Sequence, residues 1–456
     1  MAEKSSESKN PLVKFILWII EGLERTVFLG LKFTLPKRYL SPLGFLGMLT
    51  TVVFVTLGIT GGILLYYYVP TLSGAFESVR RIDQVIPYGF MFRNIHYHAS
   101  NAMVFLAAAH LYYQYFSGRY KIKNEIIWVT GIILGTVTVI EAYTGYDLLL
   151  NQRAVLAINI GSSLTNASPV IGPLLQQAIL GSGFSDIVIR FYALHVFILP
   201  IAMLVLMMLH FPRYLVLDIP MNLAITGAIL MLGGLFPVDL GVKFDPDLPP
   251  GITVPEWYVS APYAFIRTGY EKFTTGGLLP ALFILMFLVV PFIDKARKFS
   301  WADRPFFTAV GIASIGQIVV TTTWGFYINP NIELALIERL EIQPGLFYST
   351  MVLISLICFG LTYVFLRYVK ARQIAARARG RQPPGFILAL SRKWVNVVIL
   401  SLVIFQGVLN VMAYQSFELG FKNLSIFHAG AILISLSIIV HLYRYGIQLP
   451  RQIQPA

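Results

Sequence analysis

Four of the seven histidines lie in apolar stretches at spacings that place them on common helix faces. His96 and His110 are 14 residues apart, and His195 and His210 are 15 residues apart. At about 100° per residue, these separations bring a helical side chain back to within roughly 40° and 60° of its starting direction, after about 21 to 23 Å of rise. Each stretch, folded as a helix, therefore presents two imidazoles on one face.

Two such helices side by side form two sites, each with an imidazole on either side. Neutral imidazole is a common metal ligand, and a heme iron takes an axial ligand on each face of its macrocycle. The second and fourth apolar stretches cross a membrane in the same direction, so we predict the pairs His96 with His195 and His110 with His210. A packed, hydrogen-bonded histidine explains any one of these residues, but not four in this arrangement. We therefore expect two hemes, b-type first of all, although two imidazoles hold an a-type macrocycle equally well.

The remaining histidines of the apolar stretches do not fit this pattern. His428 and His441 are 13 residues apart, which places them about 140° apart on a helix, and His98 lies about 200° from His96. They cannot line one face together. We expect a packing or surface role for His98, and interfacial or partner-contacting roles for His428 and His441, with an extra cofactor ligand as the alternative for these two.

Glycines follow the same period as the histidines. Gly47 and Gly61 are 14 residues apart in the first apolar stretch, and Gly131 and Gly145 are 14 residues apart in the third. Small residues are common where membrane helices touch, so either pair alone is weak support. Beside the histidines, however, they predict two levels at which the backbone makes room for a flat ring.

The elements that position these residues are membrane helices. The chain has 456 residues, of which 56% are hydrophobic and only 12% are charged, and its mean hydropathy is +0.70. Soluble domains carry about 25% charged residues, and a spanning helix needs about 20 apolar ones. We therefore predict an all-α integral membrane protein, a helical bundle of about ten transmembrane helices with hemes inside the first four. The predicted spans lie near 43–68, 93–116, 126–148, 187–212, 220–240, 273–293, 305–327, 345–367, 394–414 and 424–443.

The net charge of +13 is distributed as expected for membrane topology, not as a nucleic-acid surface. Lys and Arg gather at 119–123, 295–304 and 367–393, which fall on one side of the membrane if the ten spans alternate. The positive-inside rule then predicts a cytoplasmic N-terminus, with the His96 pair near the outer surface. The 370–393 loop leaves open a basic patch for a partner. The single cysteine, Cys358, excludes a disulfide framework or a cysteine-based metal site.

Together these residues resemble cytochrome b of the quinol-oxidising cytochrome bc complexes. The segments from Arg93 to His110 and from Arg190 to His210 are similar to the two heme helices of that family. The 15-residue histidine spacing and the motifs Trp128–Gly131 and Thr144–Tyr146 resemble its photosynthetic branch. The segment Pro255-Glu-Trp-Tyr258 is similar to the signature of the family's quinol oxidation site. The resemblance covers roughly residues 10–370.

The resemblance implies a domain organisation as well. We expect a cytoplasmic amphipathic surface helix in 1–40, a heme-binding four-helix bundle in 41–218, and the C-terminal cytochrome b region with the Pro255–Tyr258 segment in 219–370. A basic cytoplasmic loop (371–393) and two extra transmembrane helices (394–456) would follow.

The resemblance also implies a function. The chain would oxidise quinol at an outer site, pass one electron to a Rieske-type iron–sulfur partner, and send the other across the two hemes. The expected setting is a proton-translocating respiratory complex with further subunits. The resemblance also implies a homodimer in a prokaryotic plasma membrane, in contact with lipid and without nucleic acid. An alternative is a di-heme anchor subunit that passes quinol electrons to a terminal oxidase without dividing them.

Three site residues follow from the resemblance. Glu256 would accept a proton from quinol, Tyr258 would hydrogen-bond the ring or gate access to it, and Arg93 would pair with a propionate of the outer heme. A ferric reductase or superoxide-generating oxidase also stacks two hemes between paired histidines. The Pro255–Tyr258 segment has no place in such an enzyme.

Two departures from the family pattern alter these expectations. Phe45 stands where the photosynthetic branch has a cysteine that attaches an additional heme, so we expect no such covalent heme. Tyr113 replaces an arginine that usually follows the second histidine, which leaves Arg119, Lys121 or Arg213 as candidates to pair with the inner propionates.

Glu141 is a third departure, because the family usually has an apolar residue there. It lies four residues before Gly145 and hence on nearly the same helix face. We predict that it is a second proton-handling group near the outer heme; pairing with a nearby arginine, or exposure at the interface, is the alternative. Quinol turnover against pH in Glu141→Gln tests this role, and an unchanged rate and profile would contradict it.

Overall fold

The computed structural model describes residues 42–121, 124–181, 183–211, 217–248, 251–295, 297–378 and 392–443. Within these ranges the regular structure is helical, apart from one isolated antiparallel bridge between Asn151 and Lys243. The surface helix expected in residues 1–40 lies outside the described residues. Of the loop expected in 371–393, residues 371–378 continue the preceding helix, and 379–391 lie outside the described part.

The four-helix unit that carries the histidines consists of α2, α4, α5 and a composite fourth helix. The bounds are Leu46–Tyr67 for α2, Gly89–Phe116 for α4 and Glu125–Asp147 for α5. In the composite helix, α8 (Phe184–Ala193) passes through a π-helical turn, η3 (Leu194–Ile198), into α9 (Leu199–His210). Helix α2 packs against α4, and α5 packs against α9 and α4.

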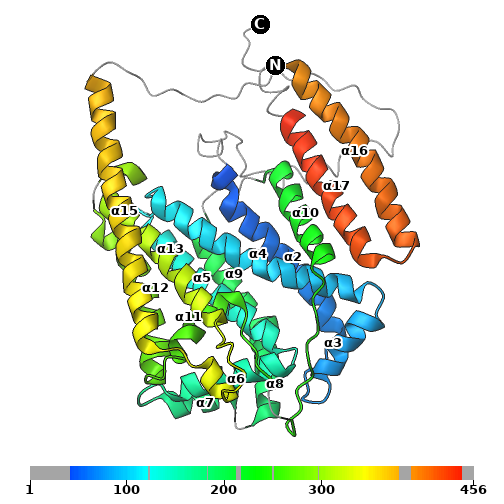
Figure 1. Ribbon diagram of the computed structural model, residues 1–456. Coiled ribbons are helices and arrows are strands. Elements are labelled where there is room, and N and C mark those ends of the chain that lie inside the picture. The colour runs from blue at the N-terminus through cyan, green and yellow to red at the C-terminus, as the bar shows by residue number, and fades with distance from the viewer. Residues whose placement is uncertain are drawn as a thin grey trace.

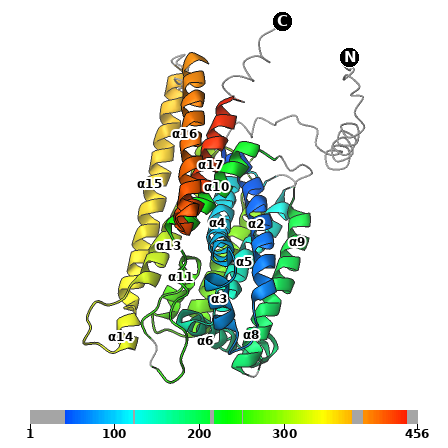
Figure 2. The same cartoon turned by 90° about the vertical axis from the view of Figure 1, so that its right-hand side faces the viewer.

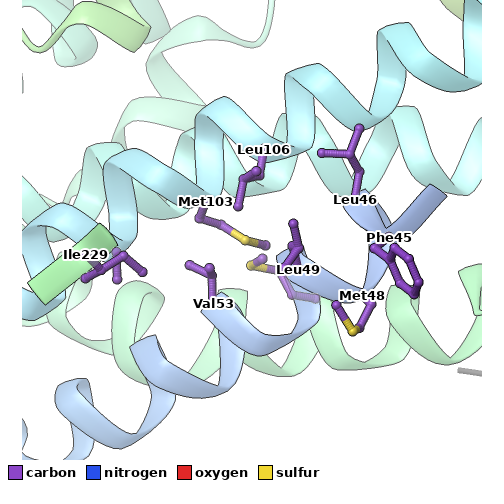
Figure 3. Close-up of a cluster of buried hydrophobic side chains, with 10 residues drawn as sticks. Phe45, Leu46, Met48, Leu49, Val53, Met103, Leu106 and Ile229 are labelled. Carbon is purple, nitrogen blue, oxygen red and sulfur yellow. The ribbon is translucent and has the colours of Figure 1, made fainter. Parts of the chain in front are cut away.

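A buried apolar cluster fills the space between the two histidine levels. Leu49 and Val53 of α2 face Met103 of α4, with Ile229 of α10 beside them (Figure 3). Met103 lies midway along the chain between His96 and His110, so this cluster separates the two levels. Full burial of such side chains stabilises the bundle by about 1.5–3 kcal/mol each, on a scale measured in water.

Short helices gather at one end of the bundle, the lower end in Figure 1. They include α3 (Ala75–Gln84), α6 (Gln152–Asn166), α7 (Gly172–Leu180) and α11 (Trp257–Ile266). Asn151 starts α6 by accepting a hydrogen bond from the Ala154 amide (2.9 Å), as an N-cap residue does. The other short elements are η2 (Pro42–Phe45), η5 (Trp301–Asp303) and α14 (Leu336–Leu340).

The second half of the chain adds membrane helices on both sides of the four-helix unit. The bounds are Ile219–Leu235 for α10, Leu279–Ile293 for α12 with the π-helical turn η4 (Phe273–Leu278) before it, Pro305–Phe326 for α13, Pro344–Ala378 for α15, Arg392–Glu418 for α16 and Lys422–Leu442 for α17. Figure 1 shows α12, α13 and α15 on one side of the unit, and α10, α16 and α17 on the other; in the view turned by 90°, α15 and α16 overlap (Figure 2).

The prediction of an all-α membrane bundle is confirmed. Among the described residues, 8 helices are long and apolar enough to cross a membrane. They correspond to eight of the ten predicted spans. The other two are α10, which is shorter, and α4, whose 28 residues include the polar side chains Arg93, Asn94 and His96. The chain is a multi-pass membrane protein.

Glycines bring α17, one of the last two helices, against α10. A Cβ on Gly430 of α17 would lie 2.5 Å from the carbonyl oxygen of Gly227 in α10, so the two backbones touch. The Ser437 hydroxyl donates to the carbonyl of Pro220 (2.6 Å) at the other end of this contact. Close backbone approach through small residues is typical of packed membrane helices.

Candidate functional site

The four predicted histidines meet in two facing pairs. The ring centroids of His96 and His195 are 6.3 Å apart with an interplanar angle of 80°, and those of His110 and His210 are 6.2 Å apart at 83°. These are the pairs expected from the spacing, with α4 on one side and the composite helix on the other. We call His96 and His195 the outer pair and His110 and His210 the inner pair, after the predicted topology.

The distances within each pair fit an iron between two axial imidazoles. A metal–imidazole bond is about 2.0 Å, and with about 1 Å more from each nitrogen to its ring centre, two trans imidazoles have centroids about 6 Å apart. Two nitrogen donors facing across one metal are the ligand set of a bis-histidine heme. The residues present therefore fit this group at both levels.

The hydrogen bonds of the rings leave the second nitrogen free to bind a metal. His195 Nδ1 donates to the carbonyl oxygen of Glu141 (3.0 Å), and His210 Nδ1 donates to that of Ile127 (2.8 Å). Because a carbonyl only accepts, the proton must sit on Nδ1, and the Nε2 lone pair remains available. At the other side of the outer pair, Thr60 Oγ1 lies 2.9 Å from His96 Nδ1. His110 Nδ1 has no hydrogen-bond partner among the described residues.

The four predicted glycines each lie against one histidine ring. A Cβ added to each would approach the Cε1 atom of that ring, at 3.1 Å for Gly47 and His110, 3.1 Å for Gly61 and His96, 2.7 Å for Gly131 and His210, and 2.5 Å for Gly145 and His195. At the last two positions a side chain would overlap the imidazole. The glycines thus align with the two levels as predicted, but the neighbour that the structure shows is the imidazole itself. Their contact with a macrocycle remains a prediction.

Glu256 is buried at the outer level in a cluster that the sequence did not reveal. It immediately precedes α11, its exposed fraction is 6%, and its carboxylate lies 2.8 Å from Arg153 Nη1. The Tyr97 hydroxyl donates to the same carboxylate (3.2 Å to Oε2). Tyr97 directly follows His96, so this cluster adjoins the outer pair.

Two further contacts hold the Pro255–Tyr258 segment against α4 and α5 of the four-helix unit. The Trp257 indole donates to Asn101 Oδ1 of α4 (2.6 Å), and the Tyr258 hydroxyl donates to the carbonyl of Ala142 in α5 (3.2 Å). Burial raises the pKa of the Tyr258 phenol well above its usual value, so the hydroxyl keeps its proton and remains a hydrogen-bond donor. Glu256 and Tyr258 therefore lie at the outer histidine level.

Glu141 is brought into contact with the outer pair. Its Oε1 atom lies 3.2 Å from His195 Nδ1, and its Oε2 atom is buried without a hydrogen-bond partner among the described residues. The pairing with an arginine that was the alternative is not seen in this part of the chain. The proton-handling role of Glu141 remains a prediction.

Arg93 lies near the outer level, already paired with a carboxylate. Its Nε and Nη2 atoms each lie 2.6 Å from an oxygen of Asp83 in α3, and Nη2 also donates to the Val238 carbonyl. Its predicted contact with a propionate would have to be made in addition to these bonds. It remains a prediction.

At the inner level, the structure distinguishes between the candidate cations. Lys121 Nζ lies 2.6 Å from the buried carboxylate of Asp294, so that charge is already compensated. Arg119 lies over the ring of Tyr113, 4.9 Å from its centroid, and no carboxylate partner is seen in the described part of the chain. Arg213 lies outside the described residues. Arg119 is therefore the better placed of the two described cations.

His98 packs in the interior, as expected, whereas His428 is buried where an interfacial or partner-contacting residue was expected, and His441 is exposed. His98 Nε2 lies 2.8 Å from the Phe236 carbonyl, and the buried His428 has its Nδ1 3.2 Å from the Ser416 hydroxyl. Neither faces another imidazole in the described contacts. His441 lies on the same helix as His428.

Comparison with known proteins places most of the chain in one family. Residues 35–216 match the family model described as cytochrome b/b6/petB, and residues 244–341 match that described as cytochrome b(C-terminal)/b6/petD. A cytochrome b6 from Synechococcus sp. (strain JA-3-3Ab) is 37% identical over 200 residues, which cover 42% of this chain and 92% of the relative. A cytochrome bc complex cytochrome b subunit from Chlorobaculum thiosulfatiphilum is 28% identical over 321 residues, covering 63% of this chain and 74% of that protein.

A solved structure shares the fold. A chain of a hyperthermophilic respiratory Complex III superposes with a TM-score of 0.53 at 22% sequence identity, over 76% of this chain and 100% of that chain. At this identity the likeness concerns the fold alone.

Proposed function

Because this chain belongs to the cytochrome b family of cytochrome bc and b6f complexes, whose members carry heme and transfer electrons, we propose that it is a quinol-oxidising subunit with two hemes in series. The observation that carries the proposal is the outer histidine pair with Glu256 and Tyr258 held beside it. The outer and inner pairs would each bind one b-type heme. A bound heme supplies an iron that accepts and gives up one electron at a time.

The chain's own residues supply the proton chemistry and orientation at the outer site. Glu256 would accept a proton from one quinol hydroxyl, and the Tyr258 oxygen, whose own proton goes to the Ala142 carbonyl, would accept a hydrogen bond from the other hydroxyl of the ring. The Arg153 side chain, one third exposed, contacts the Glu256 carboxylate and connects it with the protein surface. The Tyr97 hydroxyl holds the same carboxylate in place by donating a hydrogen bond to it, and Tyr97 is the residue that follows His96.

The remaining parts of the proposal concern partners and setting. A Rieske-type iron–sulfur protein would take one electron, and the inner heme would pass the other to an inner quinone site, in a proton-translocating respiratory complex with further subunits. We propose a homodimer in a prokaryotic plasma membrane with a cytoplasmic N-terminus. The units would be 1–40, 41–218, 219–370, 371–393 and 394–456, as the sequence indicates.

A second candidate function is favoured by the extra helix pair. The close packing of α17 on α10 adds a surface beyond the matched family region, and this surface suits docking to a terminal oxidase module. The chain would then oxidise quinol without dividing the two electrons.

Oxidant-induced heme reduction distinguishes the two functions. In the purified complex with reoxidation of the inner heme blocked, adding oxidant to a quinol-reduced sample should transiently increase heme reduction if the electrons are divided. A sample that shows quinol-dependent heme reduction but no transient increase on oxidant addition would support the anchor subunit instead.

A further inference from the structure

Helix α5 presents the same backbone arrangement to both histidine levels. At the inner level, Gly131 contacts the His210 ring, the carbonyl of Ile127 accepts from His210 Nδ1 (2.8 Å), and Thr130 Oγ1 lies 3.4 Å from that nitrogen. Ile127 precedes Gly131 by four residues and Thr130 precedes it by one.

Fourteen residues later, α5 repeats this arrangement at the outer level. Gly145 contacts the His195 ring, the carbonyl of Glu141 accepts from His195 Nδ1 (3.0 Å), and Thr144 Oγ1 lies 3.4 Å from it. The two levels therefore share the glycine, the threonine and the carbonyl acceptor. They differ in the side chain of the residue that supplies the carbonyl, which is Ile127 at the inner level and Glu141 at the outer level.

That difference places a carboxyl group on one axial ligand. Glu141 Oε1 lies 3.2 Å from His195 Nδ1, close to the carbonyl that already accepts from the same N–H. Glu141 Oε2 is buried and has no hydrogen-bond partner among the described residues, so no second hydrogen bond competes with the contact to His195. Of the other histidines, His96 meets the Thr60 hydroxyl and the backbone of Leu57, and His210 meets a backbone carbonyl. No partner of His110 Nδ1 is seen in the described ranges.

We propose that Glu141 is a positioning residue that acts through His195 to lower the reduction potential of the outer heme below that of the inner heme. An acceptor on Nδ1–H makes the imidazole a stronger electron donor and therefore favours the oxidised, more positively charged iron. Electrons delivered at the outer site would then pass to the inner heme downhill. The inference rests on the proposed function, since it requires that both pairs bind heme.

Redox titration of matched variants in the purified holoprotein tests this role. Glu141→Gln keeps the size of the side chain, and Glu141→Leu gives the outer level the apolar character of Ile127. Both should raise the outer midpoint potential at a fixed pH, the leucine variant by about tenfold in the reduction equilibrium constant (about 59 mV for one electron), and leave the inner potential unchanged. The reciprocal variant, Ile127→Glu, should lower the inner potential.

The outcomes separate the inference from its premise. If the wild type does not titrate as two heme components, the proposed function itself fails. If two components titrate and the outer potential is the same in wild type and Glu141→Gln, only the role of Glu141 is overturned. The ferric electron paramagnetic resonance signal of the outer heme provides a second readout, because it responds to the donor strength of its axial imidazoles and should shift in both Glu141 variants.

Discussion

At the residue scale, backbone groups of neighbouring helices orient the four imidazoles of the outer and inner pairs. Two of the four rings donate from Nδ1 to a carbonyl of α5, and all four lie against a glycine. Such outer contacts fix both the ring orientation and the nitrogen that binds the metal. A small change in a glycine should therefore affect heme binding without altering a ligand.

Gly145→Ala should reduce binding of the outer heme. Its Cβ would lie 2.5 Å from His195 Cε1, so the imidazole must move away from its partner. Gly135→Ala is the matched control, since Gly135 lies on the same helix and a Cβ there meets nothing within 4 Å. Heme stoichiometry from the pyridine hemochrome spectrum should fall in Gly145→Ala alone. Equal heme content in both variants would argue against close glycine–imidazole contact.

Glu256→Gln should slow quinol oxidation by about 10²-fold, the typical contribution of a positioned proton acceptor. The amide retains contacts to Tyr97 and Arg153 but is not a base. Steady-state quinol turnover measures the loss, and the heme spectrum should be unchanged. Turnover close to that of the wild type would exclude Glu256 as the acceptor.

The sequence predicted the facing histidines but not the groups around Glu256. Helical phase suffices for His96 and His110 because both lie on one straight element. Arg153 and Glu256 are far apart in sequence and come from separate short helices, so no spacing relates them. A buried carboxylate requires a partner, but only the fold identifies it as Arg153. Helical phase predicted Glu141 near the outer level, but its contact with His195 is seen only in the fold.

At the element scale, a buried cluster of charged side chains joins the four-helix unit to α12 and α13. Asp294, after α12, contacts Lys121 (2.6 Å), Arg304 (3.1 Å) and the Tyr120 hydroxyl (2.5 Å). Lys121 and Tyr120 belong to the connection between α4 and α5, and Arg304 directly precedes α13. One carboxylate therefore links three parts of the chain.

Asp294→Asn should destabilise the protein by about 3–5 kcal/mol, because it leaves two buried cations without their countercharge. The control is Asp303→Asn, which removes a more exposed pair with Lys370 (3.4 Å) and should cost about 0–1 kcal/mol. Thermal unfolding in detergent compares the two variants. Similar midpoints would show that the Asp294 cluster does not hold these helices together.

Hydropathy predicted where the membrane helices lie, but not which helices are neighbours. The apolar stretch around α10 was expected as an ordinary span, whereas the structure gives a shorter helix with α17 packed against it. The sequence shows Gly227 and Gly430 as isolated small residues, and only their contact reveals the helix pairing. The short helices α6 and α11 are fixed by individual side-chain bonds from other parts of the chain, which leave no periodic signal in the sequence.

At the scale of the whole molecule, the two imidazole pairs lie one after the other along the bundle, and the Pro255–Tyr258 segment lies beside the outer pair. The apolar cluster of α2 and α4 separates the two levels (Figure 3), and Glu256 adjoins the outer one through its hydrogen bond with Tyr97. Helix α17 stands beside α10 with α16 on its other side, away from α11 (Figure 1). The proposed quinol oxidation and electron transfer across the membrane would therefore depend on each histidine pair holding a separate heme.

An anaerobic redox titration of the purified holoprotein, followed in the heme absorbance bands, tests this dependence most directly. The wild type should titrate as two one-electron components. His195→Leu should remove the outer component and leave the other, and His210→Leu should remove the inner component. A single component in the wild type, or two components that persist in both variants, would contradict the assignment of one heme to each histidine pair.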